Sequence, residues 1–174
     1  MMQGKDIFLR AIELEDIDPL YDMENDLDNW KVSDTQMPFS RHTMEQYVLS
    51  CGSQDIYTLK QLRLMICLNE TRESIGCIDL FDFHPANRRA AVGILVRKGF
   101  RQRGYASEAL TLLLHYATEV LHLKQVYCHI DASNLPSLRL FEKHGFLRSG
   151  CLKVWEQRSG TEWEDTYLLQ RIFY

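Results

Sequence analysis

The sequence lacks any long apolar segment. No uninterrupted hydrophobic run approaches the ~20 residues that a membrane-spanning helix needs. The first ten residues, MMQGKDIFLR, also lack the apolar core of a secretory signal. We therefore expect a cytoplasmic protein with no membrane partner. Its 174 residues are the length of one ordinary domain, spanning residues 1–174.

An excess of positive charge is also lacking. The 20 Lys and Arg residues stand against 24 Asp and Glu residues, so the formal net charge is −4. Proteins that bind nucleic acid usually carry a basic excess or a basic face. These totals therefore argue against nucleic acid as the main partner.

The five cysteines and six histidines lack the spacing of a metal site or of a disulfide framework. No two cysteines form a C-x-x-C pair, and no histidines form an H-E-x-x-H motif. Structural zinc sites and small disulfide-rich folds depend on such closely spaced residues. We expect no metal site and assign these residues structural or incidental roles.

Hydrophobic periodicity predicts a single α/β (α+β) domain. Apolar stretches indicate strands at residues 7–10, 61–68, 74–83, 89–96 and 125–130, followed by a hairpin of residues 153–157 with 165–173. Helical spacing indicates helices at residues 14–23, 43–49, 107–122 and 134–144, with an irregular or short-helical loop at 25–40. This order predicts a mixed, mostly antiparallel central sheet flanked by helices. Gly93 within a strand indicates a bulge or a close approach to the backbone.

The segment from Arg101 to Ala106, RQRGYA, joins an apolar strand to an amphipathic helix. Unpaired N–H groups and the helix dipole at such a junction favour a phosphate or pyrophosphate. Gly104 would let a ligand approach the backbone without meeting a Cβ. The segment matches neither the P-loop nor the dinucleotide motif. A plain strand-to-helix connection is the alternative interpretation.

Two motifs in the expected order resemble the GCN5-related N-acetyltransferase (GNAT) superfamily. Arg101-x-x-Gly104-x-Ala106 is similar to the family's [QR]-x-x-G-x-[GA] acetyl-CoA signature. About 30 residues later, NLPSLRLFEKHGF (134–146) resembles the family's short helix that holds an Asn and ends in G-F. The segments KDIFLRAIELEDID, FHPANRRAAVGILV and GTEWEDTYLLQRIF look most like the spermidine and ribosomal-protein acetyltransferase branch.

The resemblance implies a site for acetyl-CoA, with CoA as product. Residues 91–96 and 125–130 would splay apart into a V. The implied cofactor-binding residues are Ile94, Leu95 and Val96 along the pantetheine arm; Arg101, Gln102, Arg103, Gly104, Tyr105 and Ala106 around the pyrophosphate; Asn134 on the pantetheine; and Ser137 and Phe141 beside the thiol. For Asn134 and Ser137, helix capping is the alternative role.

The implied reaction is acetyl transfer to a primary amine by direct attack in a ternary complex. An alkyl amine has a pKa of ~10.4, so making it neutral at pH 7 costs about 4–5 kcal/mol, which a general base would partly offset. A backbone N–H near Leu95 would polarise the thioester carbonyl. Many relatives have a Tyr acid where this chain has Phe141. Either Ser137 or His144 replaces that acid, or no acid is needed.

The acceptor side is less constrained by the sequence. Asp79 and Asp82 lie three apart in one strand and would face opposite sides unless a bulge intervenes. In the polyamine branch an acidic residue at a position like that of Asp79 lies at the acceptor site. The alternative is a solvated charge on a sheet edge. The predicted catalytic residues are therefore Asp79, Leu95 and Ser137.

The resemblance favours a small polycation such as spermidine or spermine as the acceptor. A protein N-terminus, as in ribosomal-protein acetyltransferases, is the second candidate. A catalytically silent CoA-binding module is the rival from another class. A homodimer is common among similar proteins and is expected here.

Overall fold

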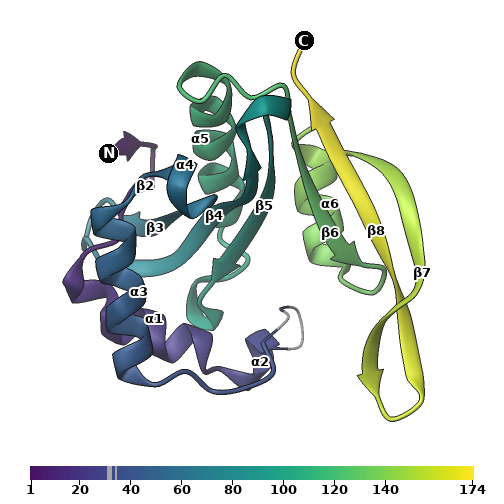
Figure 1. Cartoon of the computed structure of the whole chain (residues 1–174), viewed down its shortest axis with the longest axis horizontal. Helices are drawn as coiled ribbons and strands as arrows, with labels where there is room; N and C mark the ends of the chain where they lie inside the picture. Colours follow the sequence, from purple (N-terminus) through teal and green to yellow (C-terminus); the bar gives the residue numbers. More distant parts are fainter. Residues whose placement is uncertain (31–32, 34) are drawn as a thin grey trace.

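The computed structural model describes residues 1–30, 33 and 35–174. Within these residues the chain forms one eight-stranded sheet in the order β1-β2-β3-β4-β5-β6-β8-β7 (Figure 1). The strands are β1 (Met2–Gln3), β2 (Ile7–Ala11), β3 (Leu62–Leu68), β4 (Ser74–His84), β5 (Arg89–Val96), β6 (Gln125–Asp131), β7 (Leu147–Ser159) and β8 (Glu162–Ile172). Neighbouring strands are antiparallel except β5 and β6. The expected mixed, mostly antiparallel α/β fold is confirmed.

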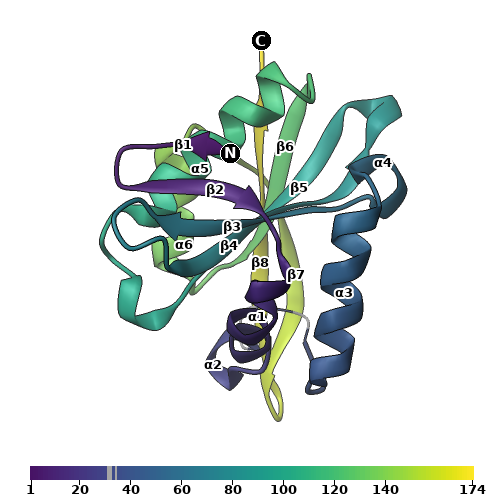
Figure 2. The same ribbon diagram turned by 90° about the vertical axis from the view of Figure 1, so that its left-hand side faces the viewer.

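The helices cover both faces of the sheet, as Figure 2 shows. They are α1 (Ile17–Glu24), α2 (Leu27–Trp30), α3 (Arg41–Ser53), α4 (Ile56–Leu59), α5 (Tyr105–Glu119) and α6 (Leu135–Lys143), with short 3₁₀ turns at Leu14–Asp16, Pro85–Asn87 and Lys98–Phe100. Strand alternation separates two cores. On β3, Leu64 and Ile66 belong to the core under α5 and α6, whereas Met65 and Cys67 belong to the core under α1 and α3.

Several element bounds differ from those that the sequence predicts. α3 begins earlier than expected because Ser40 caps its start, accepting a hydrogen bond from the Thr43 amide at 3.1 Å, and it continues to Ser53 rather than ending at residue 49. β7 begins at Leu147 rather than at residue 153, and three register shifts interrupt its alternation with β8. β1 and α4 were not expected. Part of the predicted loop at 25–40 is helical (α2), and its residues 31–32 and 34 lie outside the described residues.

The two central strands separate, as expected. β5 and β6 pair only through Arg89 with Gln125, Ala90 with Val126 and Ala91 with Tyr127. Beyond these pairs β5 continues alongside β4, while β6 continues alongside β8. The sheet therefore opens into a V from Ala91 and Tyr127 onward (Figure 1).

A bulge lies in β4 rather than at Gly93. The register of β4 against β5 shifts between Phe81 and His84, and Asp82 has a φ of 48°. Gly93 instead permits a close approach: a Cβ there would lie 3.3 Å from Cε1 of the Phe81 ring. The bulge frees Asp82 from the alternation that would otherwise fix its face.

Candidate functional site

A cavity of about 580 Å³ lies at the open end of the V, between β5 and the starts of α5 and α6. It brings together most of the predicted cofactor-binding residues: Ile94, Leu95, Val96, Arg101, Gln102, Gly104, Tyr105, Ala106, Asn134 and Ser137. Two predicted residues do not line it. Phe141 is buried in the core, 4.9 Å between ring centroids from Phe146, and the Arg103 guanidinium lies over the Phe100 ring.

The loop before α5 presents backbone donors to this cavity. Gln102 and Gly104 have φ values of 61° and 87°, in the left-handed region. Backbone that mixes such residues with right-handed ones turns successive N–H groups to the same side, forming an anion-binding nest. In the described part of the chain, the amides from Gln102 to Ser107 have no protein acceptor. No atom lies within 4 Å of the place a Cβ would take at Gly104. These donors, at the N-terminus of α5, fit a pyrophosphate.

Arg101 braces this loop from within. Its Nε donates to the Val96 carbonyl at 2.7 Å, and its Nη2 donates to Asn29 Oδ1 at 3.0 Å. Asn29 is buried and donates in turn to the Met23 carbonyl at 2.9 Å. Asn29 was not among the predicted site residues, because nothing in the irregular segment around it signals a contact 72 positions away.

Asn134 and Ser137 mark the opposite wall of the cavity. Asn134 Oδ1 accepts a hydrogen bond from the Ser137 amide at 3.3 Å, so Asn134 caps α6. Both residues also line the cavity. Asn134 therefore caps α6 and lines the cavity at the same time, so the capping role does not exclude the predicted cofactor contact.

Asp79 lies outside the cavity lining, and its side chain is mostly buried, with 13% exposed. Its two carboxylate oxygens accept hydrogen bonds from Arg63 at 2.9 and 2.7 Å. Arg63 also pairs with Glu24, and its guanidinium lies 5.5 Å from the Tyr47 ring centroid. Burial raises the pKa of the Asp79 carboxyl, an effect that the Arg63 charge opposes. Asp79 is thus one member of a buried ion-pair cluster on the α1 and α3 side of the sheet.

Comparison with known proteins decides the family. A family model described as an acetyltransferase (GNAT) domain matches residues 6–147. The chain belongs to the GNAT family. It is accordingly an N-acetyltransferase, and acetyl-CoA is its acetyl donor, as expected.

Three relatives illustrate the likeness of this GNAT chain. It is 27% identical to an uncharacterised N-acetyltransferase p20 of Bacillus licheniformis (87% of this chain, 85% of that protein). It is 22% identical to the spermidine N(1)-acetyltransferase of Escherichia coli K12 (87% and 78%). The fold matches the spermidine N-acetyltransferase of Vibrio cholerae, solved in complex with CoA and spermine, with a TM-score of 0.85 at 20% identity (96% and 95%). Among the described residues, no helix of this GNAT domain has the length and apolarity to cross a membrane.

Near the cavity of this GNAT domain, a histidine accompanies the first turn of α5. Ser107 lines the cavity, and its Oγ lies 2.8 Å from His144 Nε2. Burial and the nearby charges of Lys143 and Arg171 lower the pKa of His144. A neutral imidazole can accept a hydrogen bond from the Ser107 hydroxyl and thereby orient the hydroxyl oxygen.

Proposed function

We propose that this GNAT enzyme acetylates a primary amine of a polyamine such as spermidine or spermine, by direct attack on acetyl-CoA in a ternary complex. The observation that carries the donor half is the row of amides from Gln102 to Ser107, which have no protein acceptor in the described residues and belong, apart from that of Arg103, to residues that line the cavity. The similarity to the Escherichia coli spermidine N(1)-acetyltransferase supports the acceptor half.

The cavity residues form groups, each of which would contact a different part of acetyl-CoA. The loop amides would hold the pyrophosphate. In the register with β4, the Arg97 N–H donates to the Ile75 carbonyl, so the backbone groups of Leu95 face Cys77 and those of Ile94 and Val96 face the opening. The groups of Ile94 and Val96, which have no partner among the described residues of β6, would pair with the amides of the pantetheine arm. Within this proposal a backbone N–H near Leu95, on the open edge of β5, polarises the thioester carbonyl, and Ser137 lies beside the departing sulfur.

The acceptor would approach from the face of the sheet that carries Phe81. This ring covers Gly93 and is 42% exposed, so it offers an aromatic surface to a chain of methylenes and ammonium groups. Asp82 adds negative charge from the bulge, and Asp79 stays a predicted acceptor-side residue. Aromatic faces with carboxylates nearby suit a polycation.

The experiment is a turnover assay with acetyl-CoA and an amine panel, read by release of free thiol and by product mass. The panel holds spermidine, spermine, a simple monoamine and a peptide with a free N-terminus. Asn134→Ala should weaken CoA binding in calorimetry. Ser40→Ala is its matched control, because it removes an equivalent helix cap from α3, which is absent from the cavity lining.

Each outcome has a distinct meaning. Preferred turnover of polyamines supports the proposal, and preferred turnover of the peptide replaces it with the N-terminal acetyltransferase. CoA binding without acetylation of any amine would indicate a catalytically silent CoA-binding module. Equal CoA affinity of the Asn134 and Ser40 variants would refute the assigned cofactor contact.

A further inference from the structure

Three side chains from β4 and β6 form a connected group at the edge of the V. The Tyr127 hydroxyl donates a hydrogen bond to Asp82 Oδ2. The His129 ring packs edge-on against the Tyr127 ring, with 5.9 Å between centroids and 82° between planes. We refer to Asp82, Tyr127 and His129 as the edge group. It takes no part in the cavity lining described above.

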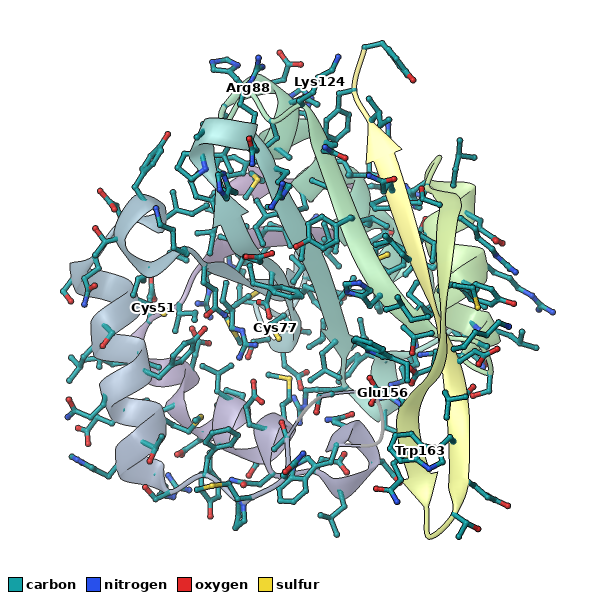
Figure 3. All side chains as sticks on the ribbon, turned by 45° about the vertical axis from the view of Figure 1, so that its right-hand side comes forward. Cys51, Cys77, Arg88, Lys124, Glu156 and Trp163 are labelled. Atoms are coloured by element: carbon teal, nitrogen blue, oxygen red, sulfur yellow. The ribbon has the colours of Figure 1, made fainter. Side chains whose placement is uncertain are left out.

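Strand geometry places this group on the acceptor side. On β6, Val126, Cys128 and Ile130 are buried in the core beneath α5 and α6, so Tyr127 and His129 face the other way. Tyr127 is the last β6 residue that pairs with β5. His129 therefore lies on the part of β6 that no longer pairs with β5, beside the opening of the V, and its side chain is exposed. Figure 3 views the molecule from this side, with the divergence of β5 and β6 in front.

The other ionisable groups on this side are less suited to accept a proton. Both oxygens of Asp79 accept hydrogen bonds from Arg63. The pKa of Tyr127 is raised to about 12 by burial and by Asp82, so its phenol remains a donor. A neutral imidazole has a free lone pair, and histidine is the side chain that most often serves as a general base.

We propose that His129 is the general base for the acceptor amine, an inference that rests on the proposed function. His129 takes one proton from the substrate ammonium, directly or through one water. The nitrogen lone pair then forms the N–C bond to the thioester carbonyl carbon, the C–S bond breaks with its electron pair going to sulfur, and the nitrogen releases its second proton to the thiolate or to water. Tyr127, fixed by Asp82, positions the imidazole.

The charged surroundings of His129 come from three strands. Tyr127 and Asp131 share its face of β6, and the Asp131 carboxylate accepts a hydrogen bond from Thr166 of β8 at 3.2 Å. The β8 residue directly opposite, Leu168, is uncharged. From β4 comes Asp82, and from β5 the Arg89 charge acts on the Tyr127 hydroxyl. The carboxylates beside this wall favour the approach of a cationic amine.

The test is the pH profile of kcat/KM for the best polyamine of the panel. His129→Gln should lower kcat/KM at pH 7 by about 100-fold, the low end of a general-base contribution. The kcat/KM of the His129→Gln variant should then keep rising with pH toward the pKa of the free amine, ~10. Tyr127→Phe should lower kcat by a smaller factor and keep the acid limb of the wild type. His115→Gln, at an exposed histidine of α5, is the matched control.

The readouts separate this inference from the proposed function. A wild-type protein that acetylates no amine refutes the proposed function and the inference with it. A wild type that turns over polyamine, with a His129→Gln variant of unchanged rate and acid limb, refutes the inference alone. A rise in the Tm of His129→Gln on addition of CoA establishes that this variant is folded. If His129→Gln does not fold, the same measurements are made on His129→Asn.

Discussion

Replacing Arg63 with Met should destabilise the fold far more than replacing a surface arginine does. The side chains of Arg63, Asp79 and Glu24 are 15%, 13% and 21% exposed. Met keeps much of the volume but leaves two mostly buried carboxylates facing each other without a cation. Breaking a buried ion pair from one side costs about 3–5 kcal/mol. For a chain of this length the loss corresponds to roughly 10 °C in Tm.

The same variant should acquire a pH dependence of known sign. Burial and Glu24 raise the pKa of Asp79, while Arg63 lowers it. Without Arg63 only the raising influences remain, so the folded-state pKa moves further above the unfolded value. A raised folded-state pKa gives stability that is present at low pH and lost as the pH rises. Arg63→Met should therefore be most destabilised near pH 8 and recover toward pH 5.

The assay is urea unfolding at pH 5 and pH 8, followed by the fluorescence of the three tryptophans. Arg41→Met is the control, because Arg41 pairs with Asp18 while both side chains are more than 60% exposed. That variant should stay within about 1 kcal/mol of the wild type at both pH values. An Arg63→Met protein that matches the Arg41→Met protein would refute the assignment of a buried cluster.

Two further predictions concern the cavity. Gly104→Ala should cost about 1–2 kcal/mol of folding free energy, because the φ of 87° at this position disfavours a Cβ, and it should also weaken CoA binding. Gly99→Ala is the control, because Gly99 has no positive φ, and it should change neither quantity. Urea unfolding measures the stability and calorimetry measures the CoA affinity. Equal CoA affinities in the two variants would contradict the nest. His144→Gln should remove one pH dependence of the free energy of unfolding. Because the folded state lowers the pKa of His144, wild-type stability falls as the pH drops below about 6.5. The stability of the wild type relative to His144→Gln, its advantage, should therefore shrink toward pH 5. An advantage that grows instead would reverse the assigned shift.

The fold was predictable where one signal is local and strong. The apolar run of β5, the glycine turn at Gly104 and the long amphipathic α5 follow one another in the chain, so periodicity locates them. Asn134 and Pro136 likewise predict the start of α6, because Asn is a common capping residue and Pro has a restricted backbone that suits the first turn of a helix. These are the elements that build the donor cavity, and most of the predicted cofactor-binding residues line it.

The acceptor side was not predictable, because its contacts join distant positions. Arg63 meets Glu24 across 39 positions, and Tyr127 meets Asp82 across 45. Neither pairing has a periodic or motif signature. The β4 bulge is equally hidden, because neither a glycine nor a proline marks the position at which Asp82 adopts its positive φ of 48°. Only the register of the assembled sheet reveals which carboxylate is paired and which reaches the edge.

The short seam between β5 and β6 has a thermodynamic consequence. Past Ala91 and Tyr127 the backbone ladder stops, and the two halves of the sheet diverge with one edge of β5 unmatched by any described strand. An extended, amide-bearing ligand arm bound along this edge would continue the hydrogen-bond ladder in place of a strand. Because such a ligand would bind only the folded state, a concentration of 100 Kd would add about 2.7 kcal/mol to the stability of the domain.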